Sequence, residues 1–211
     1  MRTHLLVAVA LLGLGLSAQK PAPKPAAKPA AAPQAMGPGT YATFDTSKGK
    51  FVVQLFPKDA PKSVANFVAL AQGKKAYSDP ATGGISMAPL YTNLLFFRSV
   101  PGYMVQTGDP LNNGTGKLGY SLPVEHNNLH FDQPGRMALA QVQGDPSSRG
   151  SQVFFTLKAV PELDKEGFLV IGQVVQGLDV VQALSEGPRK AGQTDVPAYP
   201  NILNKVTITQ K

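Results

Sequence analysis

The chain has 211 residues, a formal net charge of +7, and neither cysteine nor tryptophan. The absence of cysteine excludes disulfides, thiolate metal ligands, thiol nucleophiles and a lipid on an N-terminal cysteine. Four basic residues and no acid precede residue 37, so the remainder carries only +3, without a basic run, and we expect no nucleic-acid partner.

Residues 1–18 have the pattern of a secretory signal peptide. A short basic start, Met1 to His4, precedes the apolar run from Leu5 to Leu16, and Ser17-Ala18 supplies small residues for cleavage. The run is shorter than the roughly 20 residues that span a bilayer. We therefore expect an exported protein, periplasmic or secreted, with no membrane span after cleavage; an uncleaved anchor is the alternative.

Residues 19–39 are rich in Lys-Pro and Ala-Pro pairs, which favour extended backbone and offer no core. They predict a disordered linker, acting either as a plain solvated spacer or as a tether to the cell envelope. The remaining residues, 40–211, are expected to form one domain and a monomer.

The domain should open with a hairpin of two short strands, 41–44 and 51–56, joined by a polar loop. A helix then follows, with Asp59 available as its cap, Pro61 in its first turn and Gly73 at its C-terminal end. Its apolar residues fall at 64, 67, 68 and 71, which gives one buried face.

Residues 74–89 contain two prolines and Gly83-Gly84, which predicts a loop. A second short helix is expected at 178–184. Further short apolar runs predict strands at 94–100, 103–106, 136–141, 152–157, 168–175 and 205–209. So many short strands and so few helices favour an antiparallel β-barrel.

The stretch from Phe96 to Asp109 sets one arginine and one glutamine among large apolar side chains. Strand alternation would place Phe96 and Arg98 on one face, and Met104 and Gln106 on one face after the Pro101-Gly102 turn. Such a face suits a bulky, uncharged substrate. An ordinary hairpin with a solvated arginine would give the same spacing.

This stretch, FFRSVPGYMVQTGD, is similar to the cyclophilin signature F-H-R-x-[IV]-P-x-F-M-x-Q-x-G-D. The likeness continues from Thr40 to the C-terminus through NGTG at 113–116, PGRMALA at 134–140, GSQVFF at 150–155, Leu163-Asp164 and VIGQV at 170–174. The resemblance implies a mainly β fold, a closed eight-stranded antiparallel β-barrel capped by two α-helices.

The resemblance also implies a peptidyl-prolyl cis-trans isomerase that acts on proline-containing polypeptides without metal or organic cofactor. Arg98 matches the family's catalytic arginine. The substrate-binding positions carried over by the resemblance are Tyr103, Met104, Gln106, Ala140, Gln141, Val142, Phe154, Leu163 and Phe168.

Several of these positions have competing interpretations. Pocket residues could equally be barrel core, and a slip of one residue would exchange Phe154 with Phe155. Phe97 stands where the family usually has histidine, Gln141 replaces a common asparagine, and Glu162 replaces a tryptophan found in many relatives. These departures leave open a non-catalytic chaperone or adaptor that binds proline peptides. A third alternative is an enzymatically idle barrel whose linker does the work by anchoring.

Other motifs are weaker. His126 and His130 are four residues apart, which could ligate a metal on a helix, but no helical pattern surrounds them and a structural His130 is favoured. Ser151 lacks the nucleophile elbow expected of a serine hydrolase.

Overall fold

The computed structural model describes residues 36–141 and 150–211. The expected signal peptide, all but the last four residues of the expected linker, and Val142 lie outside this part. The described domain is mainly β, as expected. Its eleven strands are β1 (Thr40–Thr46), β2 (Gly49–Leu55), β3 (Tyr77–Ser78), β4 (Ile85–Ser86), β5 (Thr92–Leu95), β6 (Arg98–Val100), β7 (Met104–Thr107), β8 (Arg136–Leu139), β9 (Val153–Thr156), β10 (Val170–Gln176) and β11 (Ile202–Gln210).

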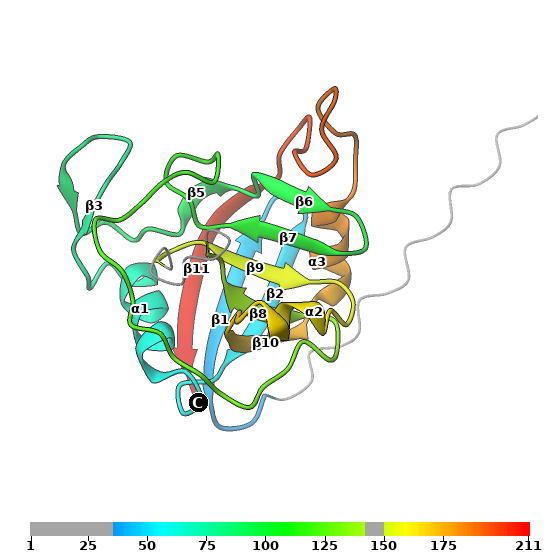
Figure 1. Cartoon of the computed structure of the whole chain (residues 1–211). Coiled ribbons are helices and arrows are strands. Elements are labelled where there is room, and N and C mark those ends of the chain that lie inside the picture. Colours follow the sequence, from blue (N-terminus) through cyan, green and yellow to red (C-terminus); the bar gives the residue numbers. More distant parts are fainter. Residues whose placement is uncertain (1–35, 142–149) are drawn as a thin grey trace, which may run out of the picture. The chain divides into compact units, whose positions relative to one another are not determined.

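Nine of these strands form one curved antiparallel sheet, in the order β5-β11-β1-β2-β10-β8-β9-β7-β6. Figure 1 shows β11, β1 and β2 behind the strands β7, β9 and β8. Within the described residues, β5 and β6 are the two end strands and do not pair with each other. The expected closed eight-stranded barrel is therefore wrong: the sheet is a nine-stranded half-barrel.

The difference arises at Phe96-Phe97, where the single strand expected over 94–100 divides. Its first half, β5, pairs with β11, and its second half, β6, pairs with β7. The break also ends the side-chain alternation, because Phe96 is fully buried in the main core whereas Phe97 lines a cavity beside Arg98. The expectation that Phe96 shares a face with Arg98 is thus wrong.

The main core lies inside the curved sheet and contains the inward-facing aromatic residues of the first hairpin. Phe44 and Phe51 are cross-strand partners, and their rings stack at 4.7 Å. Phe155 meets both rings edge-on at 5.1 Å. All three are completely buried, and strand alternation places them together on the inner face of the sheet.

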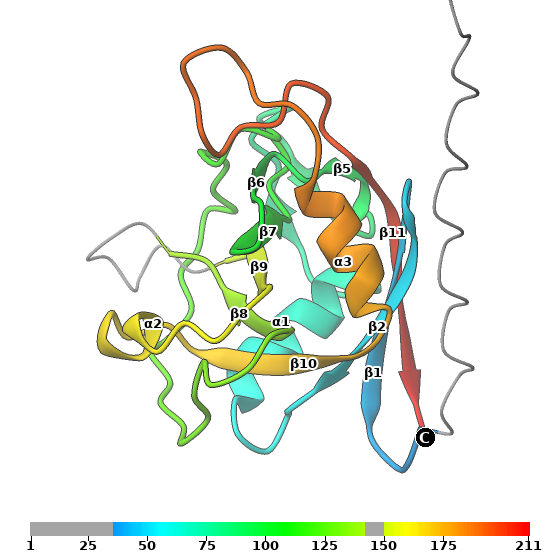
Figure 2. The same ribbon diagram turned by 90° about the vertical axis from the view of Figure 1, so that its right-hand side faces the viewer.

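The helices are α1 (Pro61–Ala71), α2 (Glu162–Lys165) and α3 (Leu178–Ser185). The first and third confirm the two expected helices, whereas α2 is a single turn that the sequence pattern did not predict. Figures 1 and 2 show α1 and α3 at opposite ends of the curved sheet. No helix within 36–141 or 150–211 is long and apolar enough to cross a membrane.

The N-terminus of α1 is capped from a distant loop. Ala60 occupies the capping position and supplies no side-chain hydrogen bond, so the expected cap at Asp59 is wrong. Instead, the Glu125 carboxylate accepts hydrogen bonds of 2.8 Å from the backbone N–H groups of Lys62 and Ser63, and one of 2.6 Å from the Ser63 hydroxyl. An anion is favourable at this positive end of the helix dipole.

Candidate active site

The β6–β7 hairpin places Arg98 and Gln106 directly opposite each other. Two residues closer to the Pro101-Gly102 turn, Val100 pairs with Met104. Because directly opposed residues of an antiparallel pair project to the same face, the arginine and glutamine side chains meet on one side of the hairpin. Nη1 of Arg98 lies 3.5 Å from Oε1 of Gln106, a long hydrogen bond.

A series of hydrogen bonds continues from this pair across the site. Nε2 of Gln106 donates to Oε1 of Gln152 at 2.9 Å, and Nε2 of Gln152 donates to the carbonyl oxygen of Gly114 at 3.1 Å. Gln106 is only 8% exposed, so its amide has few alternative partners. The series fixes the carbonyl end of Gln106 toward the arginine.

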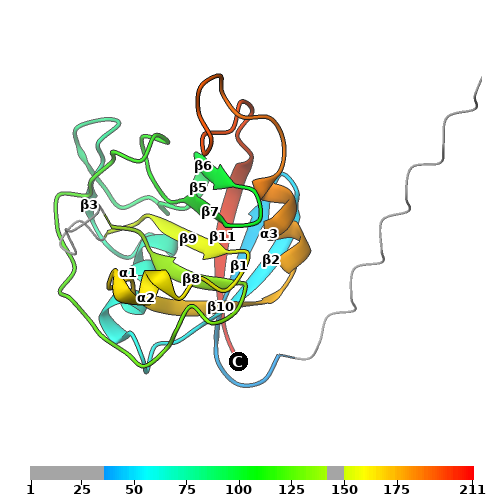
Figure 3. The ribbon, with the colours of Figure 1, turned by 45° about the vertical axis from the view of Figure 1, so that its right-hand side comes forward.

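Arg98 has a second partner on its other side. Its Nε donates to Oδ2 of Asp195 at 2.8 Å, and the backbone N–H of Ser99 donates to the Asp195 carbonyl oxygen, also at 2.8 Å. Asp195 belongs to the loop between α3 and β11, which Figure 3 shows beside β6. This loop therefore covers the end strand of the sheet with both a backbone and a side-chain contact.

A cavity of about 870 Å³ opens beside Arg98. Its apolar wall is formed by a second core cluster, in which Phe154 stacks on Phe131 at 5.9 Å and meets Phe168 edge-on at 5.3 Å. Met104 and Leu163 complete this wall and are almost buried, at 4% and 7% exposure. The cavity thus combines a closely packed apolar wall with a cationic hydrogen-bond donor at its edge.

The structure brings together nine of the ten site residues expected from the sequence. Those lining the cavity are Arg98, Tyr103, Met104, Gln106, Ala140, Gln141, Phe154, Leu163 and Phe168. Val142, the tenth, lies outside the described residues. The alternative register is also resolved, because Phe154 faces the cavity and Phe155 faces the main core.

Sequence reasoning missed a group of cavity residues that come from loops. They are Asn112, Asn113, Gly114, Glu166, Lys190, Gln193, Asp195 and Val196, with Phe97 added by the break in the strand. The NGTG motif gave a signal for part of this group. The loop after α3 gave none, because its polar and proline residues have no periodic pattern and approach Arg98 only through the fold.

The loop after β7 is organised by Asp109, the last residue of the signature. Its buried carboxylate accepts backbone hydrogen bonds from Leu111, Asn113 and Gly114. A Cβ at Gly116 would lie only 1.9 Å from Oδ1 of this carboxylate, so glycine is needed there. This loop forms the side of a smaller neighbouring cavity of about 360 Å³, which shares Gln106, Gly114, Ala140 and Gln141 with the larger one.

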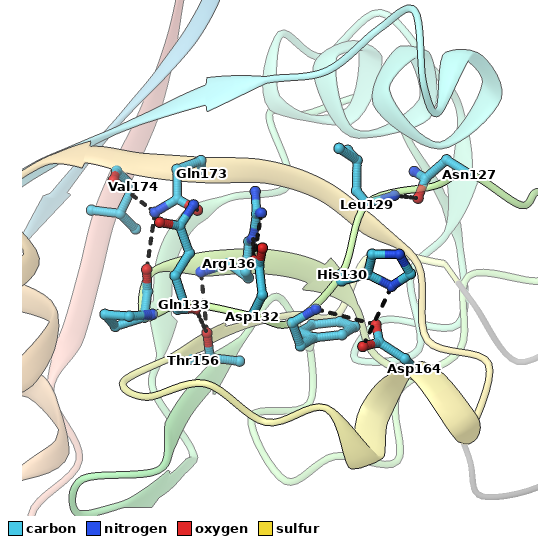
Figure 4. Close-up of polar contacts among 12 residues, drawn as sticks. Asn127, Leu129, His130, Asp132, Gln133, Arg136, Thr156, Asp164, Gln173 and Val174 are labelled. Atoms are coloured by element: carbon cyan, nitrogen blue, oxygen red, sulfur yellow. Dashed lines mark hydrogen bonds and ion pairs between the residues drawn. The ribbon is translucent and has the colours of Figure 1, made fainter.

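A polar cluster supports α2 and the strands on the side of the apolar wall (Figure 4). Asp164 accepts a hydrogen bond from the Phe131 backbone at 3.1 Å and lies 3.6 Å from Nδ1 of His130. These contacts hold the turn that carries Leu163. Nearby, hydrogen bonds from Arg136 hold the pKa of Asp132 below its ordinary value.

The two histidines do not form the helical pair that a metal site would need. Residues 121–130 have no helix, and His126 and His130 are both exposed. In the described part of the chain, no group of three or more histidine, aspartate or glutamate side chains is placed to hold a metal ion.

Comparisons with known proteins agree with this geometry. The family model described as cyclophilin type peptidyl-prolyl cis-trans isomerase matches residues 41–208. Peptidyl-prolyl cis-trans isomerase A of Mycobacterium tuberculosis is 37% identical over 171 residues, covering 80% of this chain and 91% of that protein. Peptidyl-prolyl cis-trans isomerase B of Streptomyces anulatus is also 37% identical over 171 residues, with 95% of its length covered.

Among solved structures, a cyclophilin type peptidyl-prolyl cis-trans isomerase of Cryptosporidium parvum matches with a TM-score of 0.66 and 24% identity. The match covers 82% of this chain and 98% of that chain, which shows a shared fold. The family match, the two bacterial relatives and the Arg98–Gln106 pair beside an apolar cavity lead to one conclusion: this chain belongs to the cyclophilin-type peptidyl-prolyl cis-trans isomerases.

Proposed function

We propose that this protein accelerates rotation about X–Pro peptide bonds in exported proteins and so assists their folding. The observation that carries the proposal is the position of Arg98, whose guanidinium borders an apolar cavity of about 870 Å³ and is hydrogen-bonded on two sides. A proline ring is bulky and uncharged, which matches the apolar wall.

The reaction needs no covalent intermediate and no proton transfer. Rotation about the amide has a barrier of about 18–20 kcal/mol, because the C–N bond has partial double-bond character. In the twisted state the lone pair is localised on the prolyl nitrogen. Arg98 can donate a hydrogen bond to that nitrogen and another to a neighbouring carbonyl oxygen, and it stays charged throughout.

The other cavity residues have separate roles in this proposal. Phe154, Met104, Leu163 and Phe168 hold the proline ring, and Tyr103 closes the rim. Gln106 accepts or donates a backbone hydrogen bond, and Ala140, Gln141 and Val142 line the groove that the flanking peptide crosses. A C. parvum relative of 25% identity was crystallised in the presence of the dipeptide Ala-Pro, which supports this class of ligand.

Exchange NMR on a short Ala-Pro-containing peptide tests the isomerase activity directly. We expect substoichiometric full-length protein to bring cis and trans signals into exchange within a mixing time in which the free peptide, with a lifetime of tens of seconds, shows none. Peptide binding without accelerated exchange would contradict the isomerase and support a proline-binding chaperone or adaptor.

The exported location has a separate test. Residues 1–18 support it only through their basic, apolar and small-residue pattern. In a bacterial host we expect the protein in the envelope or medium, with a mature N-terminus after Ser17 or Ala18 by mass spectrometry. An intact Met1 in the cytoplasmic fraction would contradict export.

A further inference from the structure

The second partner of Arg98 comes from a loop that the family motifs do not include. The loop between α3 and β11 covers residues 186–201, and its Asp195 contacts two consecutive residues of β6. Oδ2 accepts from Nε of Arg98 and the carbonyl oxygen accepts from the backbone of Ser99, each at 2.8 Å. Ser99 is fully buried, so the backbone contact holds the loop in place independently of the carboxylate.

The loop is also held within itself and against α3. The backbone of Lys190 donates to the Val196 carbonyl, and that of Ala198 donates to the Pro188 carbonyl, each at 2.9 Å. Arg189 donates to the carbonyl oxygens of Ser185 and Gly187 at the end of α3. Asp195 therefore lies in a braced turn, and its side chain reaches Arg98 from a fixed backbone.

The carboxylate changes what Arg98 can do. A guanidinium has five N–H donors in one plane, and the Nε–H is taken by Asp195. Gln106 lies near Nη1, so two contacts on different edges set the plane of the group. Within the described residues, Nη2 of Arg98 donates no hydrogen bond to the protein, and the side chain lines the cavity. An unrestrained arginine would instead sample many rotamers.

We propose that Asp195 is a positioning residue for the isomerase reaction, which holds Arg98 by Nε so that its Nη donors face the substrate amide. The inference rests on the proposed function. Both side chains are partly exposed, 43% for Arg98 and 37% for Asp195, and exposed ion pairs contribute little to stability. The expected effect is therefore on the orientation of the guanidinium and hence on the rate.

NMR on the full chain separates this role from a structural one, because it measures both the isomerisation rate of the bound peptide and the affinity for the peptide. In Asp195→Ala we expect the isomerisation rate on the enzyme to fall about fivefold, because the arginine regains rotamer freedom. The peptide Kd should change by less than about twofold, since the apolar wall is untouched. Asp195→Asn keeps an acceptor oxygen and should recover part of the rate.

Two spectroscopic signals report on the geometry. The Nε–Hε signal of Arg98 should lose its hydrogen-bonded shift in Asp195→Ala, while the Ser99 amide stays protected from hydrogen exchange. Asp132→Ala is the matched control, because it breaks the Arg136–Asp132 ion pair of 2.7 Å, which lies outside the cavity lining. It should change neither the rate nor the Arg98 signal.

The outcomes are distinct. An Asp195→Ala protein that isomerises as fast as the parent, or faster, overturns the positioning role alone. A slower variant that has also lost protection of the Ser99 amide overturns it too, because the loop has then detached. If the parent itself does not accelerate exchange, the proposed isomerase function fails and the positioning role fails with it.

Discussion

The side-chain amides of Gln106 and Gln152 are joined by a hydrogen bond of 2.9 Å, in which Gln106 is the donor. Because Nε2 of Gln106 is engaged in this bond, its carbonyl oxygen is left facing Arg98. Gln152 is itself held by the Gly114 carbonyl. The orientation of Gln106 is thus set by the loop after β7, and the arginine meets an acceptor on this side.

Gln152→Leu should slow isomerisation by about fivefold, the equivalent of one lost hydrogen bond. Without this partner the Gln106 amide can flip and present its NH₂ group to the guanidinium. The rate on the enzyme is measured by exchange NMR at saturating peptide. Gln182→Ala, on the exposed face of α3, is the control and should match the parent. An unaffected Gln152→Leu would show that the series of hydrogen bonds does not matter for catalysis.

Phe154→Leu and Phe155→Leu should separate binding from stability. The two residues are neighbours in β9, but Phe154 lines the cavity and Phe155 lies in the main core. Both substitutions should lower the free energy of unfolding by roughly 1–2 kcal/mol, since each changes the shape of a packed side chain. Only Phe154→Leu should raise the peptide Kd, by about threefold or more, in titrations under conditions where both variants are folded. Equal effects on Kd would contradict the assignment of the cavity wall.

Glu125→Ala should destabilise the domain by roughly 1 kcal/mol at pH 7, as expected for loss of a helix cap. Asp59→Ala is its control, because Asp59 adjoins the same helix end but, among the described residues, its carboxylate accepts no hydrogen bond from the helix. It should change stability by less than about 0.5 kcal/mol. Denaturant unfolding of both variants measures the difference, and a larger loss in Asp59→Ala would contradict the distant cap.

The same cap should give a pH dependence. Partial burial tends to raise the pKa of Glu125, but the hydrogen bonds from Ser63 and the Lys62 backbone outweigh it, so the pKa in the folded protein is lowered. The stabilisation is then fully present above the unfolded pKa of about 4.3 and is lost as the pH falls through the lower folded value. The stability difference between the parent and Glu125→Ala should shrink over this range. A constant difference down to the acid limit would contradict the charged cap.

The sequence predicted well where local pattern and packing agree. The hairpin of β1 and β2 was expected from its β-rich runs, and the spacing in α1 predicted its inner face: Val64, Phe67 and Ala71 are buried, and Val68 packs against the core. The signature located the arginine, the glutamine and most of the apolar wall, because these residues lie on regular strands whose register fixes their faces.

The remaining features depend on contacts between distant segments. The break at Phe96-Phe97 arises because β5 and β6 pair with different strands, which no local pattern reveals. Glu125 caps α1 through Ser63, 62 residues earlier in the chain, and no local pattern around Glu125 indicates this role. Asp195 approaches Arg98 across 97 residues of sequence, from a loop without periodicity.

Exchange NMR on one proline peptide, comparing the parent with Arg98→Ala and Arg98→Lys, tests whether the Arg98 guanidinium catalyses the rotation. We expect Arg98→Ala to bind the peptide still but to lose about 100-fold of the on-enzyme rate, as when a preorganised donor is removed. Arg98→Lys should recover little, because the three donors of an ammonium diverge from a single nitrogen and do not reproduce the planar fork that contacts Asp195 and the substrate from different edges. An Arg98→Ala variant that isomerises the peptide at the parent rate would rule out Arg98 as the catalytic hydrogen-bond donor.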